Sequence, residues 1–243
     1  GCFPNIFGFK EFCMLNICIS LSFSISLSSS SWSHLNLRLS KCDSDISTFS
    51  LHPLKTITTG EGGIVTTNSK KLGEKIKKLR SLGIEKNNAK HWKYDVKYIG
   101  FNFRLNDFQC ALGTNQIAKI SKFILYRRKV FKNYQKLLNN LKEINLPKHN
   151  SSYQSAHHLF IITLKKPNFI KKENLIKFML KNKILLQYHY IPIYKFKVFH
   201  GKFINKDSEI YYKSAVSLPI YYGLTYKQQV YIVKKIKEFF KKN

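Results

Sequence analysis

The sequence is poor in acidic residues and in arginine. Its 243 residues include 13 Asp or Glu against 42 Lys or Arg, a formal net charge of +29 at pH 7. Such an excess raises the question of binding to nucleic acid or another polyanion. Base edges are read most often by arginine forks, yet only five of the basic residues are arginines: Arg38, Arg80, Arg104, Arg127 and Arg128. The many Lys, Asn, Ile, Tyr and Phe residues are explained together by A/T-rich codons. We prefer this explanation, and nucleic-acid binding stays as an alternative.

Paired cysteines and clustered histidines are also missing. The five cysteines are odd in number and form no Cys-x-x-Cys pair, which argues against a disulfide framework and a structural zinc site. The adjacent histidines His157 and His158 would point to opposite faces of a strand, which argues against joint metal ligation. No metal site is predicted, and a reducing cytoplasm is the expected compartment.

A long uninterrupted apolar run is absent as well. The stretch Leu15–Ser31 alternates Ile, Leu or Phe with Ser, and it is too short and too broken for a membrane span. A secretory signal starting at Met14 would need a basic region that is missing. Residues 1–40 are rich in serine and almost uncharged, unlike everything after them. We therefore expect this atypical segment to come from a shifted reading frame or a false gene start.

From about Lys41 onward the pattern is that of a folded α/β protein. Strands are expected where short β-branched or apolar runs occur, and helices where apolar residues recur every three or four positions. The expected strands are 64–67, 158–164 and 185–190. The first expected helix begins after Asn68 or Ser69 and ends at Gly83. Further helices are expected over 106–141, with a break near Gly113 or Ser121, and over 172–181 and 208–217. The last helix is expected to begin at Thr225 with the capping box Thr225-x-x-Gln228, and its inner face to consist of Val230, Val233, Ile236 and Phe240.

One segment carries residues suited to covalent chemistry, Phe49–Gly63. Lys55 lies among apolar and small hydroxyl residues, and Pro53 constrains the backbone two positions before it. Gly60, Gly62 and Gly63 allow backbone conformations that other residues avoid. A sheltered lysine loses its proton readily and becomes the nucleophilic amine that Schiff-base chemistry requires. An ordinary surface lysine beside a glycine turn is the alternative.

The segment resembles the Schiff-base lysine motif of the sugar-nucleotide aminotransferases, pyridoxal-phosphate (PLP) enzymes with the aspartate-aminotransferase-like, type I fold. In that family Ser-Phe-His-Pro-x-Lys precedes Gly-Glu-Gly-Gly, and here only Leu51 departs from the motif. Similar blocks follow in the family's order at 100–113, 156–160, 189–192 and 208–220. The resemblance implies an α/β PLP-dependent transferase fold, with residues 41–125 as the remainder of a truncated large domain and 126–243 as a C-terminal α+β small domain.

The resemblance also implies roles for individual residues. Lys55 would bind PLP covalently and move a proton between the substrate carbon and the cofactor. Ser50 would hydrogen-bond the cofactor phosphate, and Asn102 would reach the phosphate or the substrate across a dimer interface. Arg104 would pair with an anionic group of the substrate or form a structural ion pair. His189 and Tyr190 would lie near the sugar-nucleotide pocket or form a half-buried aromatic strand.

The implied reaction transfers an amino group from L-glutamate to the 4-keto carbon of a UDP-linked deoxy-N-acetyl sugar. The variants Cys110–Gly113 and Gln187–Ile193 most resemble the subgroup on the pseudaminic acid pathway. The implied assembly is a homodimer that does not bind membranes. A transaminase for another keto sugar nucleotide and an inactive gene fragment remain alternatives. Residues 1–40 match none of the family's N-terminal cofactor-binding elements, so we expect this polypeptide alone to have little or no transaminase activity.

Overall fold

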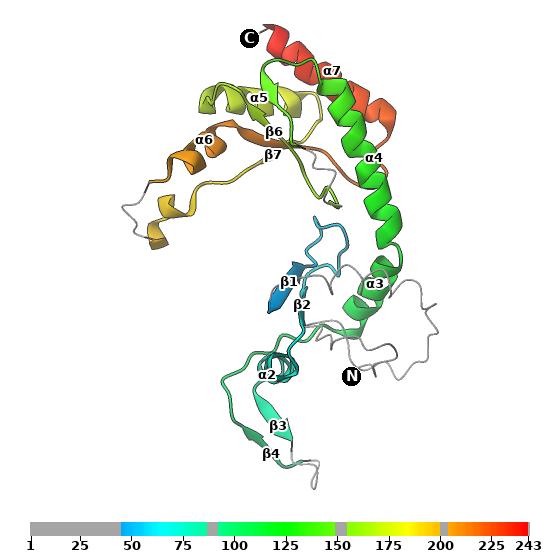
Figure 1. The fold of residues 1–243 in the computed structure, drawn as a ribbon, viewed down its shortest axis with the longest axis vertical. Helices are drawn as coiled ribbons and strands as arrows, with labels where there is room; N and C mark the ends of the chain where they lie inside the picture. Colours follow the sequence, from blue (N-terminus) through cyan, green and yellow to red (C-terminus); the bar gives the residue numbers. More distant parts are fainter. Residues whose placement is uncertain (1–44, 87–91, 149–154, 200–203, 243) are drawn as a thin grey trace. The chain divides into compact units, whose positions relative to one another are not determined.

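The computed structural model describes residues 45–86, 92–148, 155–199 and 204–242 (Figure 1). The atypical segment 1–40 lies outside the described residues. The chain divides into two compact units, the first ending at Ser121 and the second beginning at Lys122. The predicted division at 125/126 remains a prediction. No helix in the described ranges combines the length and the hydropathy needed to cross a bilayer.

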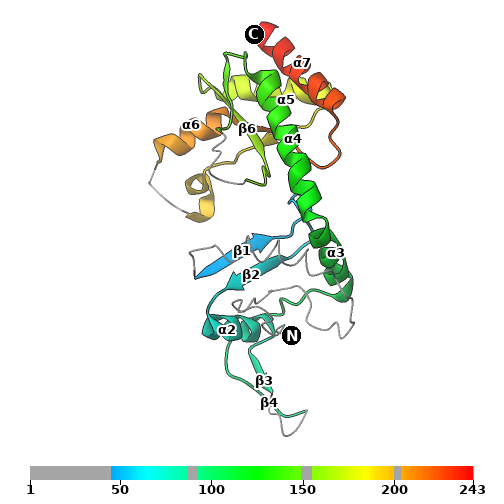
Figure 2. The same ribbon diagram turned by 45° about the vertical axis from the view of Figure 1, so that its right-hand side comes forward.

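The first unit is built around an antiparallel pair of strands, β1 (Ile46–Ser50) and β2 (Gly63–Thr67). Figure 2 shows the two strands side by side. Helix α2 (Lys70–Arg80) follows, and then come the short antiparallel strands β3 (Ile84–Lys86) and β4 (Tyr94–Val96). Helix α3 (Asp107–Ala118) closes the unit. The two strands β1 and β2 thus hold the two ends of the lysine segment.

Local sequence accounts for the ends of α2 and α3. The side chain of Ser69 accepts a hydrogen bond from the Leu72 N–H, as expected for an N-cap. Asn106 and Gln109 form a capping box at the start of α3. Gly83 has φ +71°, and a Cβ there would come within 1.8 Å of the Tyr98 carbonyl oxygen. Glycine is therefore required where the chain leaves α2.

The second unit is a four-stranded antiparallel sheet packed against helices. Its strands, in the order β5-β6-β8-β7, are β5 (Ile144–Asn145), β6 (Phe160–Leu164), β8 (Ala215–Leu218) and β7 (Gln187–Tyr188). Its helices are α4 (Ile120–Leu138), α5 (Phe169–Lys181), α6 (Lys206–Ser214) and α7 (Tyr226–Lys242), with 3-10 turns η1 (Ile193–Lys195) and η2 (Lys197–Phe199). This is the α+β arrangement expected for the C-terminal part.

A single apolar core holds the second unit together. Alternate residues of β6 (Phe160, Ile162 and Leu164) are buried against side chains of α4, α5 and α7. Tyr134 of α4 is fully buried, and its hydroxyl donates to the Pro219 carbonyl at 3.0 Å. Burial also raises the pKa of this tyrosine, because the phenolate would be desolvated. The core contributes most of the unit's stability, since burial of apolar area is the dominant favourable term in folding.

The predicted helix 208–217 is correct up to Ser214 and wrong for its last three residues, 215–217. Helix α6 ends at Ser214, and Ala215–Leu218 forms strand β8, whose four residues are all buried. The strand lies between β6 and β7, so both of its edges are hydrogen-bonded. A short apolar run suits a buried strand as well as a helix, and only the neighbouring strands decide between them.

Other predicted elements are correct in kind and differ at their ends. The helix 106–141 is broken at Lys119, near the expected Ser121, and ends at Leu138. The strand 185–190 is reduced to Gln187–Tyr188, and β6 begins two residues later than expected. Val230 was predicted on the inner face of α7 but is 40% exposed. That face is formed by Ile232, Val233, Ile236, Phe239 and Phe240.

Candidate active site

The candidate site begins at the loop between β1 and β2, whose base is closed by backbone hydrogen bonds. The Leu51 N–H donates to the Gly62 carbonyl at 2.9 Å, and the Thr59 N–H donates to the Leu51 carbonyl at 3.1 Å. The Leu51 side chain is 1% exposed and packs with Ile64 and Ile117. Leu51, the departure from the family motif, is therefore the apolar anchor of the loop.

A tight turn at the tip of this loop presents Lys55. The Lys55 N–H donates to the His52 carbonyl at 2.9 Å, and the Leu54 N–H donates to the His52 Nδ1 at 3.2 Å. Because Nδ1 accepts this bond, the imidazole proton lies on Nε2, which is 3.7 Å from a carboxylate oxygen of Glu61. His52 thus supports the loop by hydrogen bonds to its backbone.

The expected shelter for Lys55 is not observed. Its side chain is exposed, and the neighbouring Leu54 is 63% exposed. The expectation was wrong because apolar neighbours in sequence shelter a side chain only when they pack over it. Within the described ranges the Lys55 Nζ has no hydrogen-bond or ion-pair partner. The turn therefore holds the backbone of Lys55 in a defined position while its amine remains in contact with solvent.

Two glycines set the return path of the loop. Gly60 has φ +85° and Gly62 has φ +134°, conformations that side chains disfavour. A Cβ on Gly62 would lie 3.0 Å from both the Leu105 Cδ2 and the Thr59 Oγ1. The carbonyl of Glu61, the residue between Gly60 and Gly62, accepts hydrogen bonds from the Thr59 hydroxyl at 2.5 Å and from the Gln109 side chain at 3.4 Å. The loop is thereby held against the start of α3.

Ser50 lies at the end of β1, opposite Gly63 on β2. Its Oγ accepts a hydrogen bond from the His52 N–H at 3.3 Å, and its side chain is exposed. Ser50 therefore lies at the strand end from which the loop carrying Lys55 begins. A hydroxyl at this exposed position is free to donate its proton to a phosphate oxygen.

Asn102 and Arg104 form a second group in the first unit. The Arg104 Nε donates to the Asn102 Oδ1 at 2.9 Å, and both side chains are exposed. Their segment runs beside the end of α2, where Asn102 forms an antiparallel bridge with Ser81. In the described part of the chain neither Asn102 nor Arg104 contacts Lys55 by a hydrogen bond or an ion pair. The roles predicted for them stay predictions.

His189 and Tyr190 belong to the second unit and have contrasting environments. His189 is 4% exposed, and its Nε2 is hydrogen-bonded to the Ser217 hydroxyl on β8. Burial, together with the positive charge of Lys172, lowers the pKa of His189. Tyr190 is 67% exposed and stacks edge-on against His189. Tyr190 is thus available to a ligand, whereas His189 serves as its buried support.

A buried lysine near His189, Lys172, was not predicted from the sequence. Lys172 is completely buried, and its Nζ donates to the Tyr212 carbonyl. A signal was present, because Lys172 lies on the apolar face of its helix, three and four positions before Leu175 and Ile176. A lysine at such a position is easily taken for one of the many solvent-exposed lysines of this chain.

Comparisons with known proteins show the family of this chain. Residues 37–237 match the model of the DegT/DnrJ/EryC1/StrS aminotransferase family. The chain therefore belongs to this family, whose members are PLP-dependent enzymes.

Two named relatives and one solved structure are similar to this chain. The chain is 34% identical over 192 residues to the UDP-4-amino-4,6-dideoxy-N-acetyl-beta-L-altrosamine transaminase of Campylobacter jejuni strain 81-176, covering 78% of this chain and 50% of the relative. It is 34% identical over 181 residues to the Helicobacter pylori protein of the same name, covering 73% and 48%. The solved H. pylori PseC, an aminotransferase of pseudoaminic acid biosynthesis, has TM-score 0.76 and 31% identity, covering 82% of this chain and 54% of that one. The chain thus spans about half the length of these relatives.

Proposed function

We propose that the protein of which this chain is a part transfers an amino group from L-glutamate to the 4-keto carbon of a UDP-linked deoxy-N-acetyl sugar. The observation that carries the proposal is the loop of residues 51–62, which presents the amine of Lys55 on a hydrogen-bonded turn. Family membership gives the reaction class, and the transaminases at 34% identity suggest the sugar.

In this proposal Lys55 is the catalytic residue. Its Nζ would hold the cofactor by a covalent bond until the substrate amine displaces it, and the freed amine would then accept and return the proton at the reacting carbon of the substrate. Bound PLP supplies an electron sink that stabilises the carbanion. Ser50 donates its hydroxyl proton to the cofactor phosphate. His52 keeps the turn in place, so that the amine approaches from one direction.

Two groups of residues, each described within its own unit, are proposed to contact the substrate. Asn102 and Arg104 offer amide and guanidinium donors at an exposed position, where they would bind a phosphate or carboxylate oxygen. The exposed ring of Tyr190 would contact the sugar nucleotide, with His189 behind it. The net charge of +29 would favour approach of an anionic nucleotide sugar.

We further propose that the active protein is a homodimer. An exposed amine is well hydrated and stays a poor nucleophile until water is excluded. Since Lys55 is exposed in the described chain, a second copy is the proposed source of its cover. Asn102 of one protomer would then serve the loop of the other.

The test is reductive trapping of the cofactor. The 243-residue chain is incubated with PLP, reduced with sodium borohydride, digested and analysed by mass spectrometry. We expect one pyridoxyl group on the peptide that contains Lys55. The variant Lys55→Ala should lose this label, because the amine that condenses with the aldehyde is gone. The matched control Lys75→Ala removes an exposed lysine of α2 and should keep it.

A second step tests the substrates. Protein that is loaded with PLP but not reduced, and that accepts nitrogen from L-glutamate and delivers it to a UDP-linked 4-keto sugar, supports the full proposal. Delivery to a differently linked keto sugar would keep the transaminase and replace the substrate. Label spread evenly over surface lysines in both variants would contradict the assignment of Lys55.

A further inference from the structure

The buried lysine of the second unit has no role in the proposed chemistry, and its position is unfavourable by itself. Lys172 is 0% exposed, and it is the only lysine buried in the described part of the chain. It lies in the first turn of α5, where the helix dipole disfavours positive charge. Burial of an ammonium group costs free energy unless polar or aromatic partners compensate. We therefore looked for a function of a lysine that is buried at the start of a helix.

Three aromatic rings and one carbonyl surround the ammonium group. The Lys172 Nζ lies 4.5 Å from the ring centroid of Tyr212, 4.9 Å from that of Phe169 and 5.4 Å from that of Tyr188. It also donates to the Tyr212 carbonyl. These cation–π contacts and the hydrogen bond compensate for lost hydration. We call Lys172 with these three rings the lysine cage.

The residues of the lysine cage come from three elements, and one of them, Tyr188, directly precedes His189 and Tyr190 in the sequence. Phe169 begins α5, Tyr212 belongs to α6, and Tyr188 is the last residue of β7. The Tyr188 hydroxyl also donates to the Glu173 carboxylate at 3.1 Å. The next two residues along the chain are His189 and Tyr190. Any movement of Tyr188 would therefore displace both.

We propose that Lys172 is a positioning residue, whose buried ammonium fixes Tyr188 and thereby holds His189 against Ser217 and Tyr190 at the surface. The role of His189 and Tyr190 in substrate binding rests on the proposed function. The positioning itself depends only on the contacts of the cage. The two parts can consequently be tested separately.

The effect of the Lys172 charge on the pKa of His189 can be used to measure this positioning. His189 is contacted by the Tyr190 and Tyr211 rings and by the Ser217 hydroxyl, and Lys172 and Glu173 of α5 are the charged groups on the side of Tyr188. Burial and the Lys172 charge both lower the pKa of His189. Loss of that positive charge should let His189 bind a proton at higher pH.

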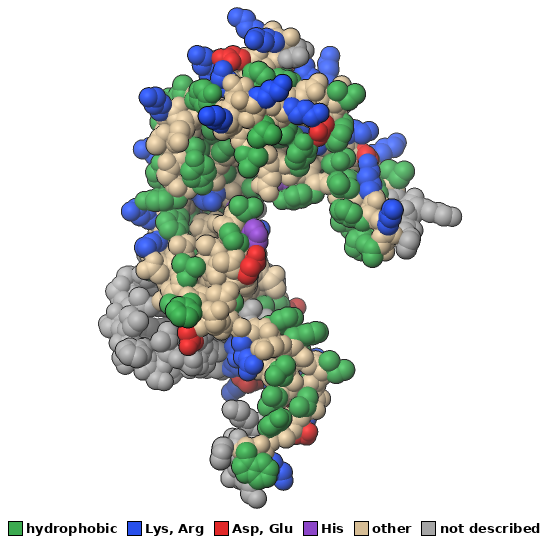
Figure 3. All heavy atoms as spheres, turned by 180° about the vertical axis from the view of Figure 1, so that it is seen from behind, with side chains coloured by type: hydrophobic (Ala, Val, Ile, Leu, Met, Phe, Trp, Pro, Cys, Tyr) green, Lys and Arg blue, Asp and Glu red, His purple; other side chains and the backbone are tan. Residues whose placement is uncertain are grey.

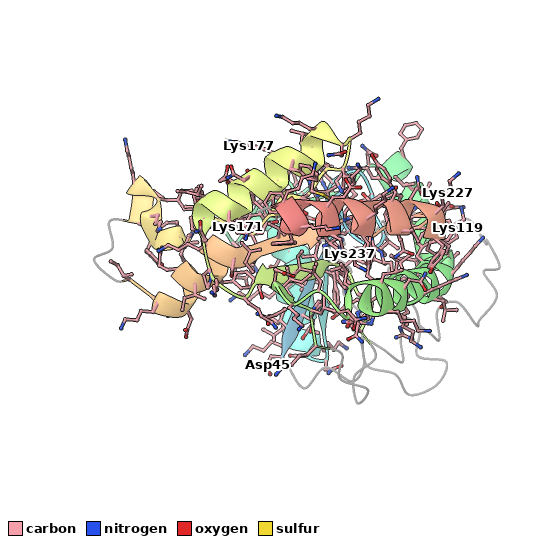
Figure 4. The ribbon with its side chains drawn as sticks, turned by 90° about the horizontal axis from the view of Figure 1, so that it is seen from above. Asp45, Lys119, Lys171, Lys177, Lys227 and Lys237 are labelled. Atoms are coloured by element: carbon pink, nitrogen blue, oxygen red, sulfur yellow. The ribbon has the colours of Figure 1, made fainter. Side chains whose placement is uncertain are left out.

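The experiment follows the imidazole signals of His189 by NMR during a pH titration of the full chain. Lys172→Met keeps an unbranched apolar side chain in the cage and removes the charge. We expect its His189 titration to move to higher pH and the ring signals of Tyr188 and Tyr190 to shift. Lys177→Met is the matched control, because Lys177 lies exposed on the same helix (Figure 4). It should leave these signals unchanged.

If Lys172→Met does not fold, the same titration is carried out with Lys172→Gln. Gln keeps a hydrogen-bond donor for the Tyr212 carbonyl but removes the positive charge. A folded, uncharged variant with unchanged His189 and Tyr190 signals overturns the proposal. In a transaminase assay the same variant should raise KM for the sugar nucleotide more than it lowers kcat. NMR shifts in a chain whose wild type takes no borohydride-stable pyridoxyl label at Lys55 would retain the positioning role and reject the proposed function.

Discussion

Glu85 is a half-buried carboxylate of the first unit that forms two ion pairs. It lies on β3 and binds two lysines, Lys78 at the end of α2 and Lys97 just after β4, the latter at 2.7 Å. The hydrogen bonds from Lys78 and Lys97 lower the pKa of the Glu85 carboxyl to about 2. The pair of lysines also links the helix to the β3–β4 hairpin. At the scale of single residues, this group makes a pH-dependent contribution to stability.

The sign of that dependence follows from the lowered pKa. A carboxyl whose folded pKa lies below the usual 4.5 contributes stability above pH 4.5, and this is lost as the pH falls toward about 2. We therefore expect the free energy of unfolding of the first unit to decrease over this range. Glu85→Gln should flatten this part of the profile. Urea denaturation at a series of pH values measures it.

The control for this prediction is Asp95→Asn on the partner strand. The Asp95 Oδ1 accepts the Val96 N–H at 2.8 Å, and an asparagine oxygen can accept the same bond. This variant should keep the acid slope of the wild type. Equal slopes for the wild type and Glu85→Gln would mean that the two lysines do not stabilise the carboxylate in solution.

At the scale of elements, α7 depends on the cap at its start. The Thr225 N–H donates to the Gln228 Oε1 at 2.9 Å, and the Gln228 N–H donates to the Thr225 Oγ1 at 3.3 Å. This is the capping box expected from the sequence. The helix supplies five apolar side chains to the core of the second unit, so its first turn matters for the entire unit.

Thr225→Ala should lower the free energy of unfolding of the second unit by about 1 kcal/mol, because it leaves N–H groups of the first turn without an acceptor. Denaturant unfolding followed by circular dichroism measures the change. Ser208→Ala is the matched control, since the exposed Ser208 is bonded in the cap of α6 only through its backbone N–H. Equal losses in both variants would refute a specific capping effect.

At the scale of the whole molecule, the net charge of +29 is dispersed. Figure 3 shows lysine and arginine side chains scattered among hydrophobic ones on the face it displays. Scattered lysines attract polyanions without defining a site, because sequence-specific readout needs donors aligned with base edges. This distribution agrees with codon bias as the source of the charge.

Binding to duplex DNA should therefore be weak, independent of sequence and strongly reduced between about 50 and 200 mM salt. Fluorescence anisotropy with two unrelated duplexes measures it. Lys237→Met on α7 should change the affinity by less than about twofold, as expected when no single lysine dominates. A large loss in this one variant, or a preference for one duplex, would instead indicate a focused nucleic-acid site.

Much of the local structure could be predicted from sequence because its causes are local. Ser69 and Thr225 mark helix starts through their side-chain oxygens, and Gly60 and Gly62 occupy backbone conformations that other residues avoid. The apolar spacing of α2 and α5 predicts their buried faces. The lysine motif identified the family, and the match over residues 37–237 confirms it.

The remaining features depend on partners distant in sequence. Ala215–Leu218 is a strand because β6 and β7 offer hydrogen bonds on both sides. Lys172 is enclosed by aromatic rings because α6 and β7 bring Tyr212 and Tyr188 to it. The spacing within α5 places Lys172 on the apolar face of the helix but does not specify these partners. The strand Ala215–Leu218 and the ring contacts of Lys172 could not be predicted from local patterns, because both depend on residues distant in sequence.

The sequence by itself determined the family, through motif blocks that follow one another in a fixed order. It also determined the glycine turn of the lysine loop and most helix positions, since these follow from residues within a few positions of one another. The tertiary structure alone decided that Lys55 is exposed, that His189 is buried against Ser217 and that Lys172 is enclosed by rings. Exposure and electrostatic environment depend on which distant side chains pack against a residue, and those neighbours exist only once the chain has folded.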